Sequence, residues 1–197
     1  MAEIPLFPLP LVLFPGGKLA LQIFETRYLD MIRQCMKDST GFGIVLIKEG
    51  AQVLSGQDQQ LPSVAHCGTY CEIVDFDQQR NGLLQVMVQG QVKFSIRDQY
   101  ENPNRLMLGQ VELLPLETET PVPENKAHLV AALQSLIQHE QIRSLGLTID
   151  FANAGEVGAR LTEFLPCPDE FKQRMLELKD PQVRLSELEK QLLRMQE

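Results

Sequence analysis

The sequence predicts an α+β protein in which an antiparallel β half with one helix, residues 1–118, precedes a small α-helical bundle, residues 119–197. Two observations predict this division. Segments with the two-residue apolar period of strands follow one another as far as Leu116, and segments with the 3.6-residue period of helices begin after Pro123. The segment between them is rich in threonine and proline, which interrupt both kinds of element.

Composition and charge indicate a globular, acidic chain. Its 197 residues are 44% hydrophobic, which is enough for a core, and 18 Lys+Arg against 26 Asp+Glu give a formal net charge of −8. Nucleic-acid binders usually carry a basic face, and no basic block occurs here, so nucleic acid is not the expected partner. Four cysteines suit a reducing compartment, and prolines break the early apolar runs before they could form a signal helix or membrane span. We therefore expect a cytoplasmic protein without a membrane segment.

The apolar stretch from Ile4 to Tyr28 supplies the first elements. Pro5 and Pro8 lack an amide hydrogen, which predicts an edge or kinked strand rather than a central one. A Pro-Gly-Gly turn at 15–17 leads to an alternating, half-buried strand over 18–23. A helix follows, with an apolar side formed by Phe24, Tyr28, Met31, Ile32, Cys35 and Met36 and with Arg27 on the polar side.

The rest of the β half reads as consecutive strands. Residues 42–48 are nearly all apolar and predict a buried strand, and residues 50–64 have no period and predict a loop. Four strands are then expected at 68–77, 83–89, 91–100 and 106–116, with turn signals between them that include Asn81-Gly82. They lie too close together for intervening helices. The pattern therefore favours an antiparallel meander curled into a barrel or pseudo-barrel.

Four apolar stripes predict the helices of the second half. They comprise Leu129, Leu133, Leu136 and Ile137; Val157, Leu161, Phe164 and Leu165; Phe171, Met175 and Leu178; and Leu185, Leu188, Leu192 and Met195. Asp180 is expected to cap the last helix, because Pro181 follows it at the position where helices tolerate proline.

Several short motifs resemble the substrate-binding domain at the amino terminus of Lon proteases. They are Phe7-Pro8-Leu9, Leu13-Phe14-Pro15-Gly16, Ile23-Phe24-Glu25-Thr26-Arg27-Tyr28, Gly41 to Leu46, Gly68 to Phe76, Gly82-Leu83-Leu84, Leu165-Pro166 and Lys172-Gln173-Arg174. Thr26 replaces the proline that this family often has. The resemblance covers nearly the whole chain and rests on the order and spacing of these motifs. It implies a PUA-like fold for the β half. Since some bacterial proteins consist of this domain alone, it also implies a domain that acts without the ATPase and Ser-Lys protease modules.

The resemblance implies a binding module whose ligand is polypeptide, and a protease system is one candidate partner. Phe14, Glu25, Arg27 and Tyr28 belong to the resembling motifs, and we expect them to border a groove for polypeptide. Two alternatives remain open: RNA binding, because PUA-like folds occur in RNA-associated proteins, and a hydrolase built from scattered acids and histidines. The number of subunits is not indicated.

No pattern in the sequence predicts a catalytic residue, a metal or a cofactor. Gly16-Gly17-Lys18 lacks the upstream glycine and the following Ser or Thr of a phosphate-binding loop. Cys67 and Cys71 are four residues apart on an expected strand, roughly 13 Å from end to end, which is too far for one zinc ion. His128 and His139 would lie about 16 Å apart on a single helix. The carboxylates of Asp75 and Asp77 are best interpreted as solvated.

Overall fold

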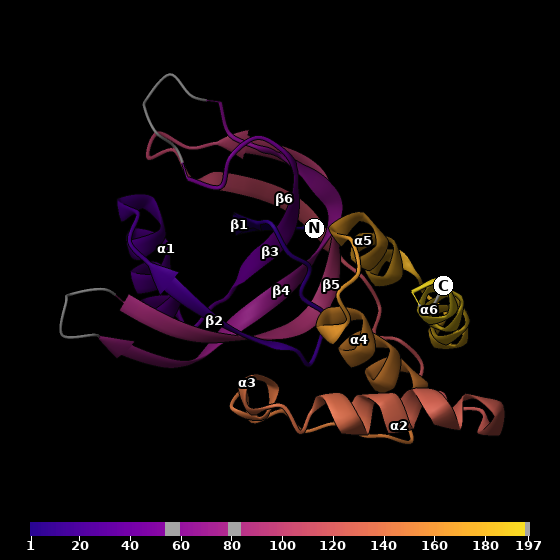
Figure 1. Ribbon diagram of the computed structural model, residues 1–197. Helices are drawn as coiled ribbons and strands as arrows, with labels where there is room; N and C mark the ends of the chain where they lie inside the picture. The colour runs from indigo at the N-terminus through magenta and orange to yellow at the C-terminus, as the bar shows by residue number, and fades with distance from the viewer. Residues whose placement is uncertain (54–59, 79–83, 196–197) are drawn as a thin grey trace. The chain divides into compact units, whose positions relative to one another are not determined.

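The computed structural model describes residues 1–53, 60–78 and 84–195. The chain divides into two compact units, Met1–Pro115 and Leu116–Glu197. The described residues of the first unit form six strands and one helix: β1 (Ala2–Leu9), β2 (Lys18–Ile23), α1 (Thr26–Asp38), β3 (Phe42–Glu49), β4 (Ser63–Gln78), β5 (Leu84–Glu101) and β6 (Met107–Leu113) (Figure 1). The α+β class expected from the sequence is confirmed. The expected Asn81-Gly82 turn lies outside the described residues.

The sheet of the first unit is curled and mixed. Its strand order is β2-β5-β4-β3-β1-β6, and β5 also pairs with β6, so the pairings of β5, β4, β3, β1 and β6 run in a cycle. Because β2 adds to β5 outside this cycle, the sheet is not a regular closed barrel. The expected antiparallel meander is confirmed for β4, β5 and β6, but the sheet as a whole is mixed, because β1 pairs with β3 in parallel. Parallel neighbours need a long crossover, and β2 with α1 supplies it.

Of the two alternatives predicted for β1, an edge strand or a kinked strand, the edge strand is wrong. β1 lies between β6, which pairs with Ala2 to Leu6, and β3, which pairs with Leu6 to Leu9. The two ladders overlap only at Leu6. Pro5 and Pro8 each lie where β1 has a partner on one side alone, which is how a strand between two neighbours accommodates residues without an amide hydrogen.

The strands predicted at 83–89 and 91–100 form one long strand, β5. Gly90 separates the two predicted strands, but β5 continues through it, with a register shift against β4 between Tyr70 and Cys71. A Cβ atom at Gly90 would lie 2.4 Å from the carbonyl oxygen of Phe14. The glycine therefore permits the turn after Leu13 to approach β5, and it does not end the strand.

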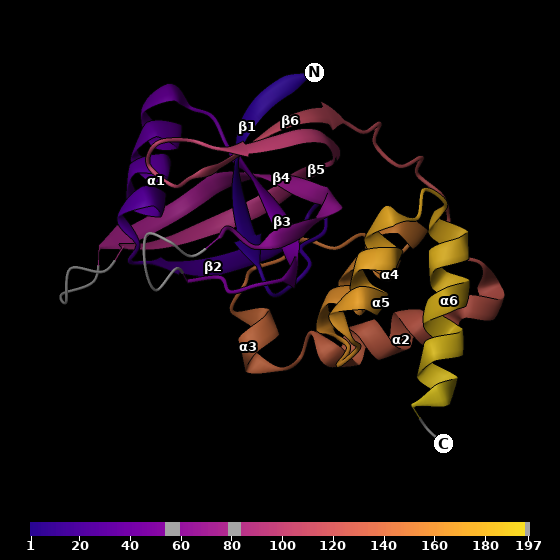
Figure 2. The same cartoon turned by 90° about the horizontal axis from the view of Figure 1, so that it is seen from above.

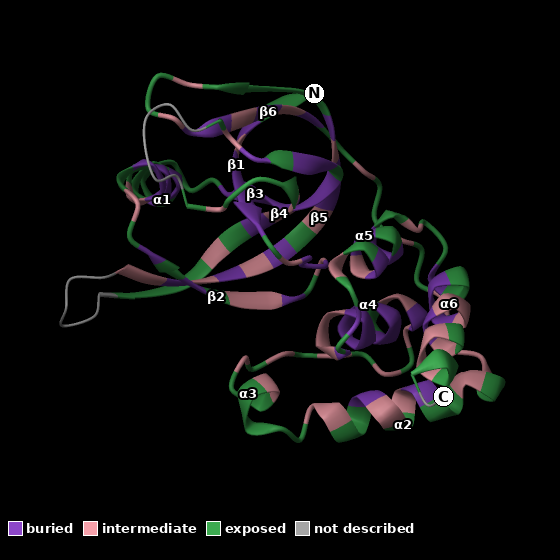
Figure 3. Cartoon of the chain, turned by 45° about the horizontal axis from the view of Figure 1, so that its top comes forward, coloured by how far each residue is buried: buried purple, intermediate pink, exposed green. Residues whose placement is uncertain are grey.

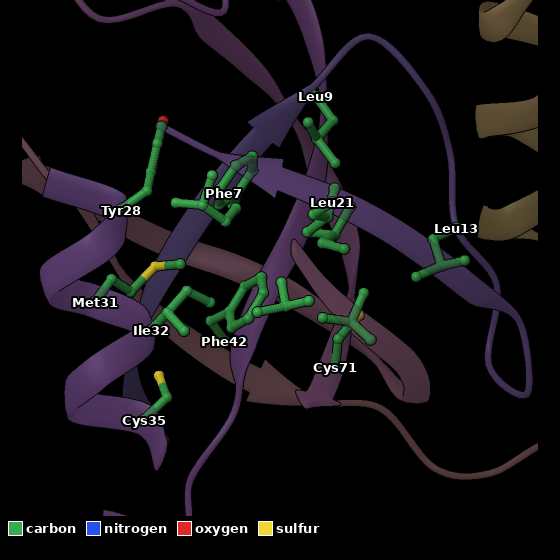
Figure 4. Packing of buried hydrophobic residues seen from close by; sticks show 14 of the residues in the cluster. Phe7, Leu9, Leu13, Leu21, Tyr28, Met31, Ile32, Cys35, Phe42 and Cys71 are labelled. Carbon is green, nitrogen blue, oxygen red and sulfur yellow. The ribbon is translucent and has the colours of Figure 1, made fainter. Parts of the chain in front are cut away.

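The core of the first unit lies between α1 and the sheet. Tyr28, Met31, Ile32 and Cys35 face the strands, where they pack among residues that include Phe7 and Phe42 (Figure 4). Leu13 and Tyr28 lie at opposite ends of this cluster (Figure 4). The helical period of the apolar residues thus places α1 on the sheet.

The second unit is built from helices α2 (Ala127–Leu136), α3 (Glu140–Arg143), α4 (Ala154–Phe164), α5 (Asp169–Glu177) and α6 (Pro181–Arg194), with a 3₁₀ turn at Glu124–Lys126 (Figure 2). Helix α4 contacts α2, α5 and α6 and is the most continuously buried of them (Figure 3). The expected cap is confirmed, because the Asp180 carboxylate accepts a hydrogen bond from the Gln182 amide at 2.8 Å. Among the described residues, no helix combines the length and apolar character needed to cross a bilayer.

A buried arginine joins the start of the second unit to its last helices. The guanidinium of Arg184 pairs with both carboxylate oxygens of Glu117 and donates to the carbonyl oxygens of Met175, at 2.9 Å, and Leu178, at 3.0 Å. The residue is fully buried. A buried charge is tolerated when it is paired and its donors are used, as they are here.

Candidate functional site

The helix start holds three of the four residues expected to bind. Arg27, predicted on the polar side of α1, is only 8% exposed. Its guanidinium bonds to the carboxylate of Glu25 at 3.1 Å and to the carbonyl oxygens of Arg105 at 2.9 Å and Gln52 at 3.3 Å. It also lies 4.4 Å from the ring centroid of Tyr28. The helical period predicted an exposed Arg27 because it depends only on residues within the helix. The carbonyl groups that Arg27 binds belong to loops distant in the sequence.

The ring of Tyr28 is buried as well. It stacks on Phe7 with ring centroids 4.0 Å apart. Burial raises the pKa of Tyr28 to about 12, opposed by the Arg27 charge and reinforced by Glu25. At neutral pH the phenol is therefore protonated, and Tyr28 acts as a packing residue and not as an acid or base.

Phe14, the fourth expected residue, belongs to a different place in the unit. It is 1% exposed, and its carbonyl oxygen accepts a bond from the Gly17 amide at 3.0 Å in the turn that pairs with Gly90. The structure brings Glu25, Arg27 and Tyr28 together and does not bring Phe14 to them. Participation of these four residues in binding stays a prediction. Because Phe14, Arg27 and Tyr28 are buried, the role that fits them is to hold α1 and the turn in position.

An open groove of about 460 Å³ lies at the other end of α1. One wall is the end of the helix, from Cys35 and Met36 to Ser39 and Thr40, and the other is the β4 segment Glu72–Phe76. We refer to it as the α1–β4 groove. No sequence pattern predicted this groove, although β4 combines acids with apolar side chains there: the segment contains Glu72, Asp75 and Asp77 together with Ile73, Val74 and Phe76.

The β4 wall of the groove is a strand edge. The β3–β4 ladder ends where Phe42 pairs with Cys71, while β4 continues beside β5 to Gln78. Within the described residues, the Glu72–Gln78 segment therefore has a strand neighbour on one side only. Gly41 sets the point where β3 departs, because a Cβ atom there would lie 2.0 Å from the carbonyl oxygen of Cys71.

Exposed apolar side chains accompany this edge. Phe76 is 57% exposed, Val74 is 45% exposed, and Met36 is 39% exposed on the opposite wall. The register of β4 against β5 shifts between Ile73 and Asp75, so Val74 is the extra residue of a β-bulge.

Charge and hydrogen bonding give the edge a defined character. Glu72 and Asp75 line the groove, and the Asp75 carboxylate accepts a hydrogen bond from the Phe76 amide at 2.8 Å. The carboxyl-terminal end of α1, which carries partial negative charge, faces the same space. Lys37, in the last turn of α1, offsets part of this charge. The groove is therefore apolar and acidic at once.

A second, smaller hollow of about 340 Å³ lies within the helical unit. It runs between the Pro121-Val122-Pro123 segment and α2, with Phe151 at its side. The Val122 amide donates to the carbonyl oxygen of Ala152 at 2.9 Å, so backbone pairing already occupies this segment. The hollow has an apolar lining without an adjoining strand edge.

The titratable side chains considered in the sequence do not converge. Cys67 and Cys71 are buried on β4, whereas His66 is exposed. His128 lies 3.0 Å from the Glu189 carboxylate, and His139 precedes α3, so the single helix predicted to hold both histidines is wrong: α2 ends at Leu136. Among residues 1–53, 60–78 and 84–195, no group of three His, Cys, Asp or Glu side chains could hold a metal ion.

Comparison with known proteins gives a consistent result. Residues 3–194 match the model of the ATP-dependent protease La (LON) substrate-binding domain. A crystal structure of a Lon N-terminal domain protein from Xanthomonas campestris aligns with a TM-score of 0.76 and 29% identity, over 95% of this chain and 97% of that one. The N-terminal domain of the Mycobacterium avium complex Lon protease aligns over 95% and 96% of the two chains with a TM-score of 0.59 and 14% identity, which shows the shared fold.

One full-length curated relative is also similar. The Lon protease of Porphyromonas gingivalis is 25% identical over 149 residues, which are 75% of this chain and 17% of that protein. The chain thus spans about a sixth of the length of the curated relative that it matches.

Proposed function

Since the chain belongs to the Lon substrate-binding domain family, we propose that it is a binding module that holds unfolded or extended polypeptide in the α1–β4 groove and does not cleave it. The observation that carries the proposal is the coincidence of a free strand edge with exposed Met36, Val74 and Phe76. A folded ligand buries most of its own apolar side chains and pairs its backbone groups. An unfolded chain exposes both, and they can pair with the free edge and the apolar side chains of the groove.

The non-enzymatic part of the proposal is supported by the family and by geometry. The Lon domain of this type is the non-catalytic, substrate-binding region. In the described part of the chain, the acids, histidines and cysteines considered above lie apart or are buried, and Glu72 and Asp75 line an open groove without a histidine beside them. Hydrolysis needs a nucleophile or activated water next to a base, so binding is the better-supported activity.

RNA binding is the weaker alternative. RNA would require Lys and Arg side chains and aromatic platforms on one surface. The α1–β4 groove offers the aromatic Phe76 beside the acids Glu72 and Asp75, and the whole chain has a net charge of −8. Phosphates would be repelled there.

The proposal also includes a cytoplasmic location and cooperation with a protease. The four cysteines carry thiols and form no disulfide, which supports the cytoplasmic location.

Fluorescence anisotropy with a labelled, reduced and carboxymethylated protein as the unfolded probe tests the proposal. Binding should occur without nucleotide and should change little between low and moderate salt for a probe of low net charge, and a gel should show no cleavage. RNA of similar size should not bind. Salt-sensitive RNA binding with no affinity for the unfolded probe would support the alternative, and nucleotide-independent cleavage of the probe would contradict both.

A matched pair of variants locates the site. Phe76→Ser should weaken binding about fivefold, because burying the exposed half of a phenylalanine contributes about 1 kcal/mol. Phe24→Ser is the control: Phe24 is 56% exposed, nearly the same as Phe76, and does not line the groove. Equal losses in the two variants would show that the groove is not the binding surface.

A further inference from the structure

We propose that the α1–β4 groove selects extended segments that alternate apolar with basic residues and binds them as an added strand along β4. This inference rests on the proposed function and specifies its substrate class and binding mode. It depends on three features of the groove: the free edge, the position of the apolar side chains and the sign of the charge.

The free edge sets the backbone conformation of the ligand. Among the described residues, β4 from Glu72 to Gln78 pairs with β5 alone, and its residues Glu72–Phe76 line the groove. An extended chain can continue the sheet there by the main-chain hydrogen bonds that join any two strands. A helix could not form these bonds, since its own amides and carbonyls are already paired.

The walls set the side-chain pattern. Successive side chains of an added strand point to opposite faces of the sheet. Phe76 and Val74 stand on the exposed β4 wall and Met36 stands across the groove on α1, so one set of alternate ligand residues meets apolar surface. Apolar residues at every second position fit this arrangement.

The charge selects basic residues and disfavours self-association. Glu72, Asp75 and the carboxyl-terminal end of α1 contribute negative potential, which Lys37 only partly offsets. Two copies of this edge would bring the same acids together, and an acidic ligand would meet the same repulsion. Lysine or arginine in the ligand reverses the sign of the interaction.

Three labelled ten-residue peptides test the inference by anisotropy. The first alternates lysine with valine and phenylalanine, the second has glutamate in place of lysine, and the third is the lysine peptide N-methylated at every second residue on the edge that would pair with β4. At low salt we expect the lysine peptide to bind about tenfold more tightly than the glutamate peptide. The N-methylated peptide should lose binding, because it keeps the side chains and cannot form the ladder.

Two double variants test the charge at the groove. Glu72→Gln with Asp75→Asn should weaken binding of the lysine peptide about fivefold, since each exposed charge pair contributes only modestly to affinity. Asparagine at 75 keeps an acceptor for the Phe76 amide. Glu140→Gln with Glu170→Gln removes the same net charge from exposed sites in the helical unit and should have no comparable effect.

The outcomes separate this inference from the proposed function. Equal affinity for the lysine and glutamate peptides, or undiminished binding of the N-methylated peptide, contradicts the inference. If these peptides bind in this way and Phe76→Ser abolishes their binding, the proposed function stays intact. If neither the peptides nor the unfolded probe binds, the proposed function fails and the inference fails with it.

Discussion

Replacing Arg27 should destabilise the β unit without removing a contact to ligand. In Arg27→Met, the hydrogen bonds to the carbonyls of Arg105 and Gln52, the pair with Glu25 and the contact with the Tyr28 ring are all lost. Methionine fills most of the volume of the arginine stem, so the loss is polar. Arg27→Lys keeps the charge but cannot donate to two carbonyls in the fixed geometry of a guanidinium.

The expected loss of stability follows from these contacts. Hydrogen bonds to charged donors contribute about 1.5 to 3 kcal/mol each, and a cation near an aromatic face contributes about 0.5 to 2 kcal/mol. Arg105 and Gln52 are half-buried, so their carbonyls can recover water and the lower values apply. We therefore expect Arg27→Met to lower the free energy of unfolding by about 3 kcal/mol and Arg27→Lys by about half as much.

The chain offers a probe that is specific for this unit. It has three tyrosines, Tyr28, Tyr70 and Tyr100, all within Met1–Pro115, and no tryptophan. Tyrosine fluorescence during urea unfolding therefore follows the β unit, and peptide affinity is measured below the transition. A loss under about 1 kcal/mol would refute the supporting role of Arg27. Lost binding with unchanged stability would instead make Arg27 a ligand contact.

Three further predictions concern stability. Arg184→Met should lower the free energy of unfolding of the helical unit, followed by circular dichroism, by about 3 to 5 kcal/mol, because Glu117 and two carbonyls lose their partner. The unfolding transition followed by tyrosine fluorescence should be unchanged, and a loss below about 1 kcal/mol would contradict the prediction. Gly41→Ala should cost at least about 2 kcal/mol by tyrosine fluorescence, since its Cβ would overlap the Cys71 carbonyl, whereas tolerance would mean that β3 can leave the sheet differently. The raised pKa of Tyr28 contributes stability that is fully present below pH 10 and lost as pH rises from about 10 to about 12, at up to about 1.4 kcal/mol per pH unit. Tyr28→Phe should remove this component of the alkaline loss measured by circular dichroism, and an unchanged pH dependence would refute it.

The parts of the fold that local patterns determine were predictable. The helical period identified α1 through Tyr28, Met31 and Cys35, and Asp180-Pro181 marked the start of α6. The order of short apolar motifs was sufficient to indicate the family. These signals rely on neighbours within a few residues.

The features that depend on distant partners were not predictable. Arg27 is buried because the carbonyls of Gln52 and Arg105 converge on it, and no pattern near residue 27 encodes their position. Val74 and Phe76 alternate as inward-facing residues would, and a bulge together with the early departure of β3 leaves them exposed. The candidate site therefore arises where tertiary structure overrides the local pattern.

The position of β1 has a consequence for how the protein is made. β1 is synthesised before both of its neighbours, β3 and β6, and the pairing of Ala2 with Val111 joins residues more than a hundred positions apart. The sheet cycle cannot be completed until Met107–Leu113 has emerged, so β1 lacks one of its neighbours until then. Contacts of such separation slow folding, because the closure entropy of a long loop precedes the gain from pairing. During that interval the nascent chain itself presents an apolar, extended segment.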